Sequence, residues 1–121
     1  MAGVTTLDPI YWPLMDFDGG ELPYCAVCGR AYPLNQHHLV WRSWGEMFRD
    51  GKAVPKPTLT LCGFGSNIGP GWCHGKAHHR MLHFRNDRGR LEFIEFERPT
   101  RYLDALDCDG WEAIGGRIWR F

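Results

Sequence analysis

The sequence of 121 residues has no run of about 18 apolar residues, the length that a membrane-spanning helix needs. Its first twenty residues have neither the basic start nor the apolar core of a signal peptide, and the chain shows no internal repeat and no low-complexity segment. These absences predict a single domain, residues 1–121, in an intracellular, cytoplasmic protein without a membrane partner. A chain of this length builds only a modest core, which a bound metal ion would usefully reinforce.

The number of cysteines is odd: the chain has five, and two of them lie in the motif Cys25-Ala-Val-Cys28. This number favours thiolate metal binding in a reducing compartment over a disulfide framework. Cys62 and Cys73, joined by a glycine-rich connection, can complete a tetrahedral four-cysteine zinc site, which is the arrangement we favour. Alternatively, Cys62 is a small buried hydrophobe and a histidine completes the zinc site. Cys108 is expected to be a free thiol.

Lysine and arginine are absent from residues 1–28, although the net charge of the whole chain is zero. Residues 29–90 contain ten Lys or Arg and three acids, a net charge of +7, and all six histidines lie there. A basic segment of this size is typical of proteins that bind a phosphate backbone, so DNA is the expected partner. The expected contributors are Arg42, Lys52, Lys56, Lys76, Arg80 and Arg85.

Long regular patterns are scarce, and the sequence predicts a mixed α+β fold of short elements. Scattered Pro, Gly and acids in residues 1–24 predict an irregular N-terminal arm. A helix is predicted from His74 to about Arg85, where proline is absent. The remaining expected elements are strands at 35–41, 58–61 and 91–97, a loop with room for one helical turn at 42–57, a short helix from Tyr102 and a β-prone end.

Histidines are concentrated on the predicted helix. His74 and His78 are four residues apart and share one face, where they could chelate a metal ion, while His79 and His83 share another face. We therefore predict that His74 and His78 bind the metal ion. His79 and His83 lie about 100° around the helix axis from the first pair and cannot reach the same ion.

Another pair, His37 and His38, lies on the first predicted strand. Adjacent strand residues point to opposite faces, so only one of the two can bind an ion that lies against the helix. The other can face a substrate or water. A metal ion stabilises charge on a phosphodiester, and an imidazole, which titrates near neutral pH, can remove a proton from the attacking water.

The segments CAVC, QHHLV, TLTLC and CHGKAH, in this order, resemble the HNH endonuclease family. The resemblance covers residues 25–85 and implies a small zinc-stabilised ββα-metal (His-Me finger) core, with residues 1–24 as an N-terminal arm and 86–121 as a C-terminal strand and helix extension. It also implies a metal-dependent endonuclease that hydrolyses DNA phosphodiester bonds. Small free-standing members resemble phage-encoded nucleases, so a packaging or other DNA-processing protein is a further expected partner.

Carried over by position, the resemblance makes His38 the general base. Ligands of a catalytic divalent ion would be His37, His74 and His78, although His74 either binds the ion directly or only lines the site. Imidazole ligands accept Mn²⁺, Ni²⁺, Co²⁺, Zn²⁺ or, less readily, Mg²⁺. The structural Zn²⁺ would be held by Cys25, Cys28, Cys62 and Cys73.

One family residue is missing: the central Asn that normally precedes the thiolate ending the second strand. Pro57 or Thr58 stands in its place, and Asn67 could fold back toward the metal instead. The alternative function is therefore a non-catalytic zinc-binding module for DNA or a protein partner. Other zinc enzymes fit less well, because His74 and His78 lack the intervening Glu of a metalloprotease and the motif order of a zinc deaminase is absent.

Overall fold

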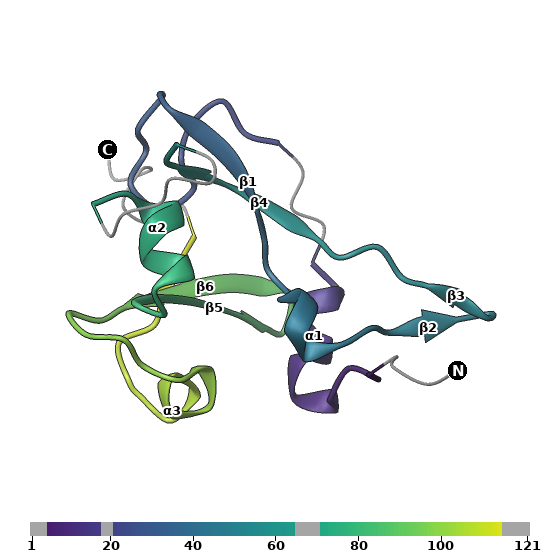
Figure 1. The fold of residues 1–121 in the computed structure, drawn as a ribbon. Helices are drawn as coiled ribbons and strands as arrows, with labels where there is room; N and C mark the ends of the chain where they lie inside the picture. Colours follow the sequence, from purple (N-terminus) through teal and green to yellow (C-terminus); the bar gives the residue numbers. More distant parts are fainter. Residues whose placement is uncertain (1–4, 18–20, 65–70, 115–121) are drawn as a thin grey trace.

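The computed structural model describes residues 5–17, 21–64 and 71–114 and combines short helices with antiparallel strands (Figure 1). The α+β prediction is confirmed. In chain order the elements are η1 (Pro9–Tyr11), α1 (Trp12–Met15), β1 (Leu34–His38), η2 (Arg42–Trp44), β2 (Phe48–Arg49), β3 (Lys52–Ala53), β4 (Thr58–Cys62), α2 (Cys73–His78), β5 (Leu82–Asp87), β6 (Arg90–Glu95), α3 (Tyr102–Leu106) and β7 (Glu112–Ala113). The strands form the sheets β1–β4, β2–β3 and β5–β6–β7.

One hydrophobic core joins the N-terminal segment to strands β4 and β6. Leu7 and Leu14 of the N-terminal segment pack in the same buried cluster as Leu59 and Leu61 of β4 and Phe93 of β6. Helix α1 also packs against β5. The expectation of an irregular arm is therefore wrong for residues 9–15, which form a 3₁₀ turn and a helical turn from which Leu14 and Met15 pack into this core.

The antiparallel pair β1–β4 positions the two strand histidines. His37 lies opposite Leu59 and His38 lies opposite Thr58. Because side chains alternate along a strand, His37 and His38 point to opposite faces of the pair. The ring of His37 lies 5.3 Å from that of His74 in α2, so His37 is the one that faces the helix.

Helix α2 is shorter than predicted and ends at His78. Arg80 adopts a left-handed φ of +60°, and the Met81 N–H donates to the Lys76 carbonyl at 2.8 Å, which is the hydrogen bond that closes a Schellman motif. The prediction of a helix to about Arg85 is therefore wrong beyond this point. Residues 82–87 instead form β5, because Leu82 and Phe84 become buried when β5 pairs with β6.

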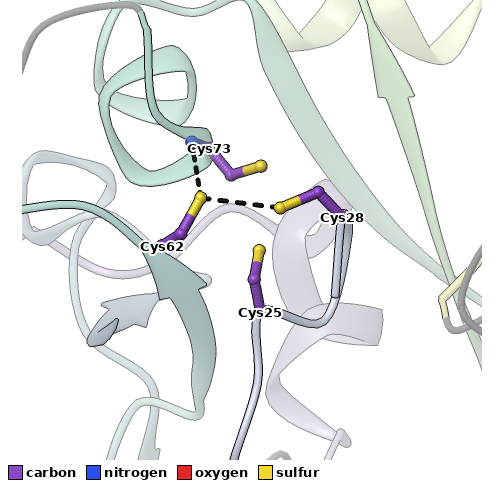
Figure 2. A group of neighbouring side chains, drawn as sticks. All are labelled: Cys25, Cys28, Cys62 and Cys73. Atoms are coloured by element: carbon purple, nitrogen blue, oxygen red, sulfur yellow. Dashed lines mark hydrogen bonds between the residues drawn. The ribbon is translucent and has the colours of Figure 1, made fainter. Parts of the chain in front are cut away.

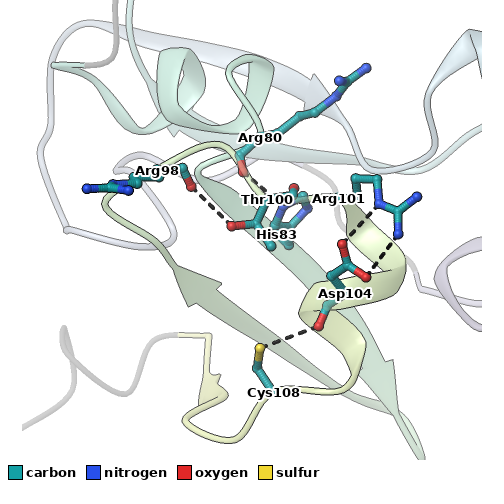
Figure 3. Close-up of polar contacts among 7 residues, drawn as sticks. All are labelled: Arg80, His83, Arg98, Thr100, Arg101, Asp104 and Cys108. Carbon is teal, nitrogen blue, oxygen red and sulfur yellow. Dashed lines mark hydrogen bonds and ion pairs between the residues drawn. The ribbon is translucent and has the colours of Figure 1, made fainter.

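His79 and His83 consequently do not share a helix face. His79 is exposed at the end of α2, whereas His83 is buried in β5. His83 Nε2 lies 3.0 Å from the Arg80 carbonyl oxygen and 2.6 Å from that of Thr100 (Figure 3). Carbonyl oxygens only accept, so Nε2 carries the proton, and His83 ties the turn after α2 to the segment before α3.

The remaining expectations are placed as follows. Expected strands at 35–41, 58–61 and 91–97 correspond to β1, β4 and β6, and the helix expected from Tyr102 is α3. The expected boundary after residue 85 falls inside β5. Asn67 and the β-prone end at 117–121 lie outside the described residues.

Within the described ranges, the helices are all too short and too polar to cross a lipid bilayer.

Candidate metal centres and the cavity beside them

Four cysteines from three separate segments converge on one point (Figure 2). Cys25 and Cys28 come from the turn before β1, Cys62 ends β4 and Cys73 begins α2. Their sulfur atoms all lie within 4.8 Å of one another. These distances allow a single metal ion such as zinc to contact all four sulfurs, and no histidine belongs to this group, so the alternative of three cysteines and a histidine is not the arrangement found in the described chain.

Backbone hydrogen bonds shape the Cys25–Cys28 turn. The Gly29 N–H donates to the Cys25 carbonyl at 2.9 Å, and the Cys25 N–H donates to the Arg30 carbonyl at 2.8 Å. Gly29 has a φ of +81°, which a residue with a side chain adopts only with strain. The adjacent Ala26 N–H donates to the Thr60 carbonyl at 2.9 Å and so fixes the turn to β4.

The ionisation of the thiols favours a bound cation. A hydrogen bond from the Cys73 thiol lowers the pKa of Cys25 to about 4, whereas burial raises the pKa of Cys62 to about 11. The same hydrogen bond, together with burial, raises the pKa of Cys73. The protein groups alone therefore stabilise the Cys25 thiolate and oppose those of Cys62 and Cys73, while a divalent cation would stabilise a thiolate at each ligand position. The donor set fits zinc.

A second group consists of three histidines. His74 and His78 of α2 meet His37 of β1, and one ring nitrogen of each lies within 4.8 Å of those of the other two. The Nε2 atoms of His74 and His78 are 3.1 Å apart. The spacing of four residues predicted for this pair is thus realised on α2, and the three ring nitrogens could hold one metal ion.

Asn35 and Gly63 position His74. His74 Nδ1 lies 3.2 Å from the Asn35 side-chain oxygen, so Nδ1 donates its proton there and Nε2 is left as the nitrogen available to a metal. Gly63 lies close to the His74 side chain: a Cβ on Gly63 would come within 3.0 Å of His74 Cβ, and its φ of +153° also favours glycine. Sequence reasoning missed Asn35, although it shares a strand face with His37 at i and i+2.

Burial keeps the three imidazoles neutral. It lowers the pKa of His37 to about 3 and that of His74 to about 4, and it lowers the pKa of His78 as well. Neighbouring histidines add to each shift, because a second positive charge would lie close by. Neutral imidazole is the form that binds metals, so the group is ready to accept an ion at neutral pH.

A cavity of about 760 Å³ opens beside the histidines. Its lining includes the exposed His38 together with His37, His74 and His78. The ring of Trp41 also lines it and lies 5.9 Å from that of His78. The structure thus brings together all four histidines singled out from the sequence on the wall of one cavity, with three in metal-binding distance and His38 next to them.

The six basic residues expected to contact DNA divide into two sets. Arg42, Lys52 and Arg80 are exposed, and Arg42 lines the cavity. The others form ion pairs: Lys56 with Glu46 at 3.0 Å, Lys76 with Glu95 at 3.4 Å and Arg85 with Glu92 at 2.8 Å.

Lys56 also lines the cavity, where its side chain is 10% exposed. Glu46, its partner, is a cavity residue that no sequence pattern identified.

No asparagine stands at the position expected for a central Asn; Pro57 and Thr58 occupy it instead. Thr58 pairs with His38 across the strands, and its hydroxyl oxygen accepts a hydrogen bond from the Gln36 amide at 3.0 Å. The Pro57 carbonyl accepts the Leu39 N–H at 3.0 Å. These bonds close the end of the β1–β4 pair next to His38.

Comparison with known proteins gives no relative: no family model, no curated protein and no solved structure matches this chain.

Proposed function

We propose that this protein is a metal-dependent endonuclease that hydrolyses DNA phosphodiester bonds on a ββα-metal core formed by β1, β4 and α2. The observation that carries the proposal is the meeting of His37, His74 and His78 within metal-binding distance, with His38 beside them on the same cavity. The order of the elements and the cysteine cluster, which we assign to a structural Zn²⁺, agree with the resemblance to HNH endonucleases.

In this proposal the histidines act differently. A divalent ion held by the three neutral imidazoles would supply positive charge to the scissile phosphate and the leaving oxygen. His38 accepts a proton from the water that attacks phosphorus, the new P–O bond forms, and the bond to the sugar oxygen breaks. Because His38 leaves the strand on the opposite face from His37, its ring is free for this proton transfer.

The cavity also supplies cations for the substrate. Arg42 is exposed at its wall, and Lys56 is oriented by Glu46. Both would attract phosphate oxygens, and counterion release would make the affinity for DNA fall steeply with salt. Salt-independent binding would indicate a protein partner instead.

The test is cleavage of supercoiled plasmid by the purified chain with Mn²⁺, Ni²⁺, Co²⁺, Zn²⁺ or Mg²⁺ added in turn. We expect metal-dependent nicking or cutting, which His38→Ala reduces about a hundred- to ten-thousandfold while the metal content stays unchanged. His79→Ala is the matched control, because His79 is also an exposed histidine next to the group but does not belong to it. A folded, metal-loaded chain that cleaves no plasmid would overturn the proposal and favour the non-catalytic module.

A further inference from the structure

A second, smaller cavity adjoins the first. It has a volume of about 260 Å³, and Trp41 and Ser43 line both cavities. Three more aromatic residues, Tyr11, Trp44 and Tyr102, line only the smaller one. Hence Trp41 and Ser43 lie at the boundary between the candidate catalytic cavity and an aromatic pocket.

The aromatic wall of this pocket is ordered. Trp44 stacks on Tyr11 with ring centroids 4.0 Å apart and planes 9° apart, and Trp41 lies nearly parallel to Trp44 at 5.9 Å and 19°. Tyr102 packs against Trp44 at 5.3 Å. Trp41 and Trp44 are only partly buried, and both line this pocket.

Positive charge lies at the rim of the pocket. The guanidinium of Arg80 lies over the Trp41 ring at 5.9 Å, and Arg101 lines the pocket while its guanidinium binds Asp104 at 3.0 Å and 3.2 Å. The two arginine side chains extend to the same side of the view in Figure 3. His83 fixes both, because it donates to the carbonyl of Arg80 and to that of Thr100, the residue before Arg101.

We infer that this pocket binds one unpaired nucleobase of the substrate strand, so that the preferred substrate is DNA with a single-stranded, bulged or flipped nucleotide next to the scissile phosphate. The inference rests on the proposed nuclease function. Aromatic faces with arginine beside them bind bases by stacking, whatever the base sequence. A paired base inside a duplex has both faces covered by its neighbours and cannot enter a pocket.

The size of the pocket selects one base. Sites for whole drug-sized ligands begin at about 300 Å³, and this pocket falls just below that limit. The larger cavity next to it holds the histidines and accommodates the phosphate and sugar. A base in the pocket would therefore hold the adjoining phosphate at the histidine group.

The test is a binding measurement that needs no cleavage. Fluorescein-labelled DNA duplexes that carry one bulged thymine, an abasic residue at the same bulge, or no bulge are titrated with zinc-loaded His38→Ala chain, and anisotropy is recorded. We expect the bulged thymine to bind about five- to a hundredfold more tightly than the abasic duplex. Equal affinities for these two duplexes would overturn the inference.

Two variants test which side chains contact the base. Trp44→Leu should abolish the preference for thymine over the abasic residue, and a folded Trp44→Leu chain that keeps the preference would contradict the proposed pocket. Arg80→Asn guards against a folding defect, because Arg80 is exposed and Asn tolerates its positive φ. We expect it to weaken thymine binding about two- to fivefold.

Arg88→Asn is the matched control for Arg80→Asn. Arg88 is also an exposed arginine with a positive φ of 56°, but it lies at the other end of β5, roughly 20 Å along the strand. Equal weakening by the two variants would show that only overall charge matters and would overturn the role of Arg80. Plasmid cleavage, measured separately, tests the nuclease function. Cleavage without a thymine preference would overturn only the inferred base pocket. A thymine preference without cleavage would overturn only the proposed nuclease function.

Discussion

The cysteine group and the histidine group are neighbours that differ in burial, in ionisation and in their access to a cavity. Helix α2 contributes to both, since Cys73 and His74 are adjacent in the chain. Three of the four cysteines are buried, and they join three segments that are distant in sequence. The histidine group instead ends in the exposed His78 and opens on a cavity. The cysteine group joins separate segments of the chain, and the histidine group is open to a cavity.

The ionisation of the two groups differs in the same sense. Burial raises the pKa of Cys62, and the hydrogen bond with Cys25 together with burial raises the pKa of Cys73. These thiols therefore need a cation before they lose their protons at neutral pH, so metal binding and folding are coupled there. His37 and His74 are neutral without any ion, because burial lowers their pKa values. An ion could leave the histidine group without leaving buried charge behind, which suits an exchangeable metal.

The largest effect should come from the cysteine group. Cys28→Ser, or chelation at neutral pH, should release zinc and unfold the chain, because structural zinc supplies about 10 kcal/mol or more and small domains are stable by only about 5–15 kcal/mol. Cys28 is exposed, so its replacement removes a ligand and little packing. Circular dichroism against temperature, with metal content, measures this. Cys108→Ser, outside the group, is the control, and an unchanged melting temperature in Cys28→Ser would contradict the zinc assignment.

Removal of a histidine ligand should leave the fold intact and abolish metal-dependent cleavage. His78→Ala should reduce bound metal from two equivalents to one and eliminate activity, because the remaining pair, His37 and His74, holds an ion weakly. His79→Ala should retain both metals and activity. Elemental analysis after gel filtration and plasmid cleavage measure the two effects. If His79→Ala loses the metal while His78→Ala retains it, the histidine site is misassigned.

A smaller loss is expected from Asn35→Ala. Without the Asn35 oxygen, the His74 ring loses the partner that fixes its proton on Nδ1, and metal affinity should fall about ten- to a hundredfold. Competition with a fluorescent chelator measures the affinity. Asn86→Ala, which removes an amide that donates to the Pro13 carbonyl and does not contact a member of the histidine group, should leave the metal affinity unchanged. An affinity equal to that of the unaltered chain would mean that Asn35 does not orient the ligand.

The smallest change should be the response of the histidine group to acid. Protonated imidazole cannot bind an ion, and the pKa values of His37 and His74 are lowered to about 3 and about 4. As pH falls from 7 to about 5, these two rings stay neutral, and burial also lowers the pKa of His78, so occupancy should change little. Metal content at each pH, minus that of His78→Ala, isolates this site. Loss of half the ion near pH 6.5, where an ordinary histidine titrates, would show that burial does not protect the ligands.

The sequence by itself determined the donor atoms and their local spacing. Two cysteines two residues apart form one half of a site, and His74 and His78 face the same way on any helix, because these relations depend only on backbone geometry. Strand alternation likewise separates His37 from His38. The short strands β1, β4 and β6 followed from β-favouring residues for the same local reason.

Only the tertiary structure decided which segments meet. The end of α2 at His78 depends on the pairing of β5 with β6, which begins twelve residues after His78. This pairing overrides helix propensity and moves His83 from a predicted helix into the core. Asn35 contacts His74, which is 39 residues away in the sequence, and Tyr11 stacks on Trp44, which is 33 residues away. No local sequence pattern encodes these contacts. Local propensity is a weak influence here, and long-range packing sets where the elements end and which side chains share a cavity.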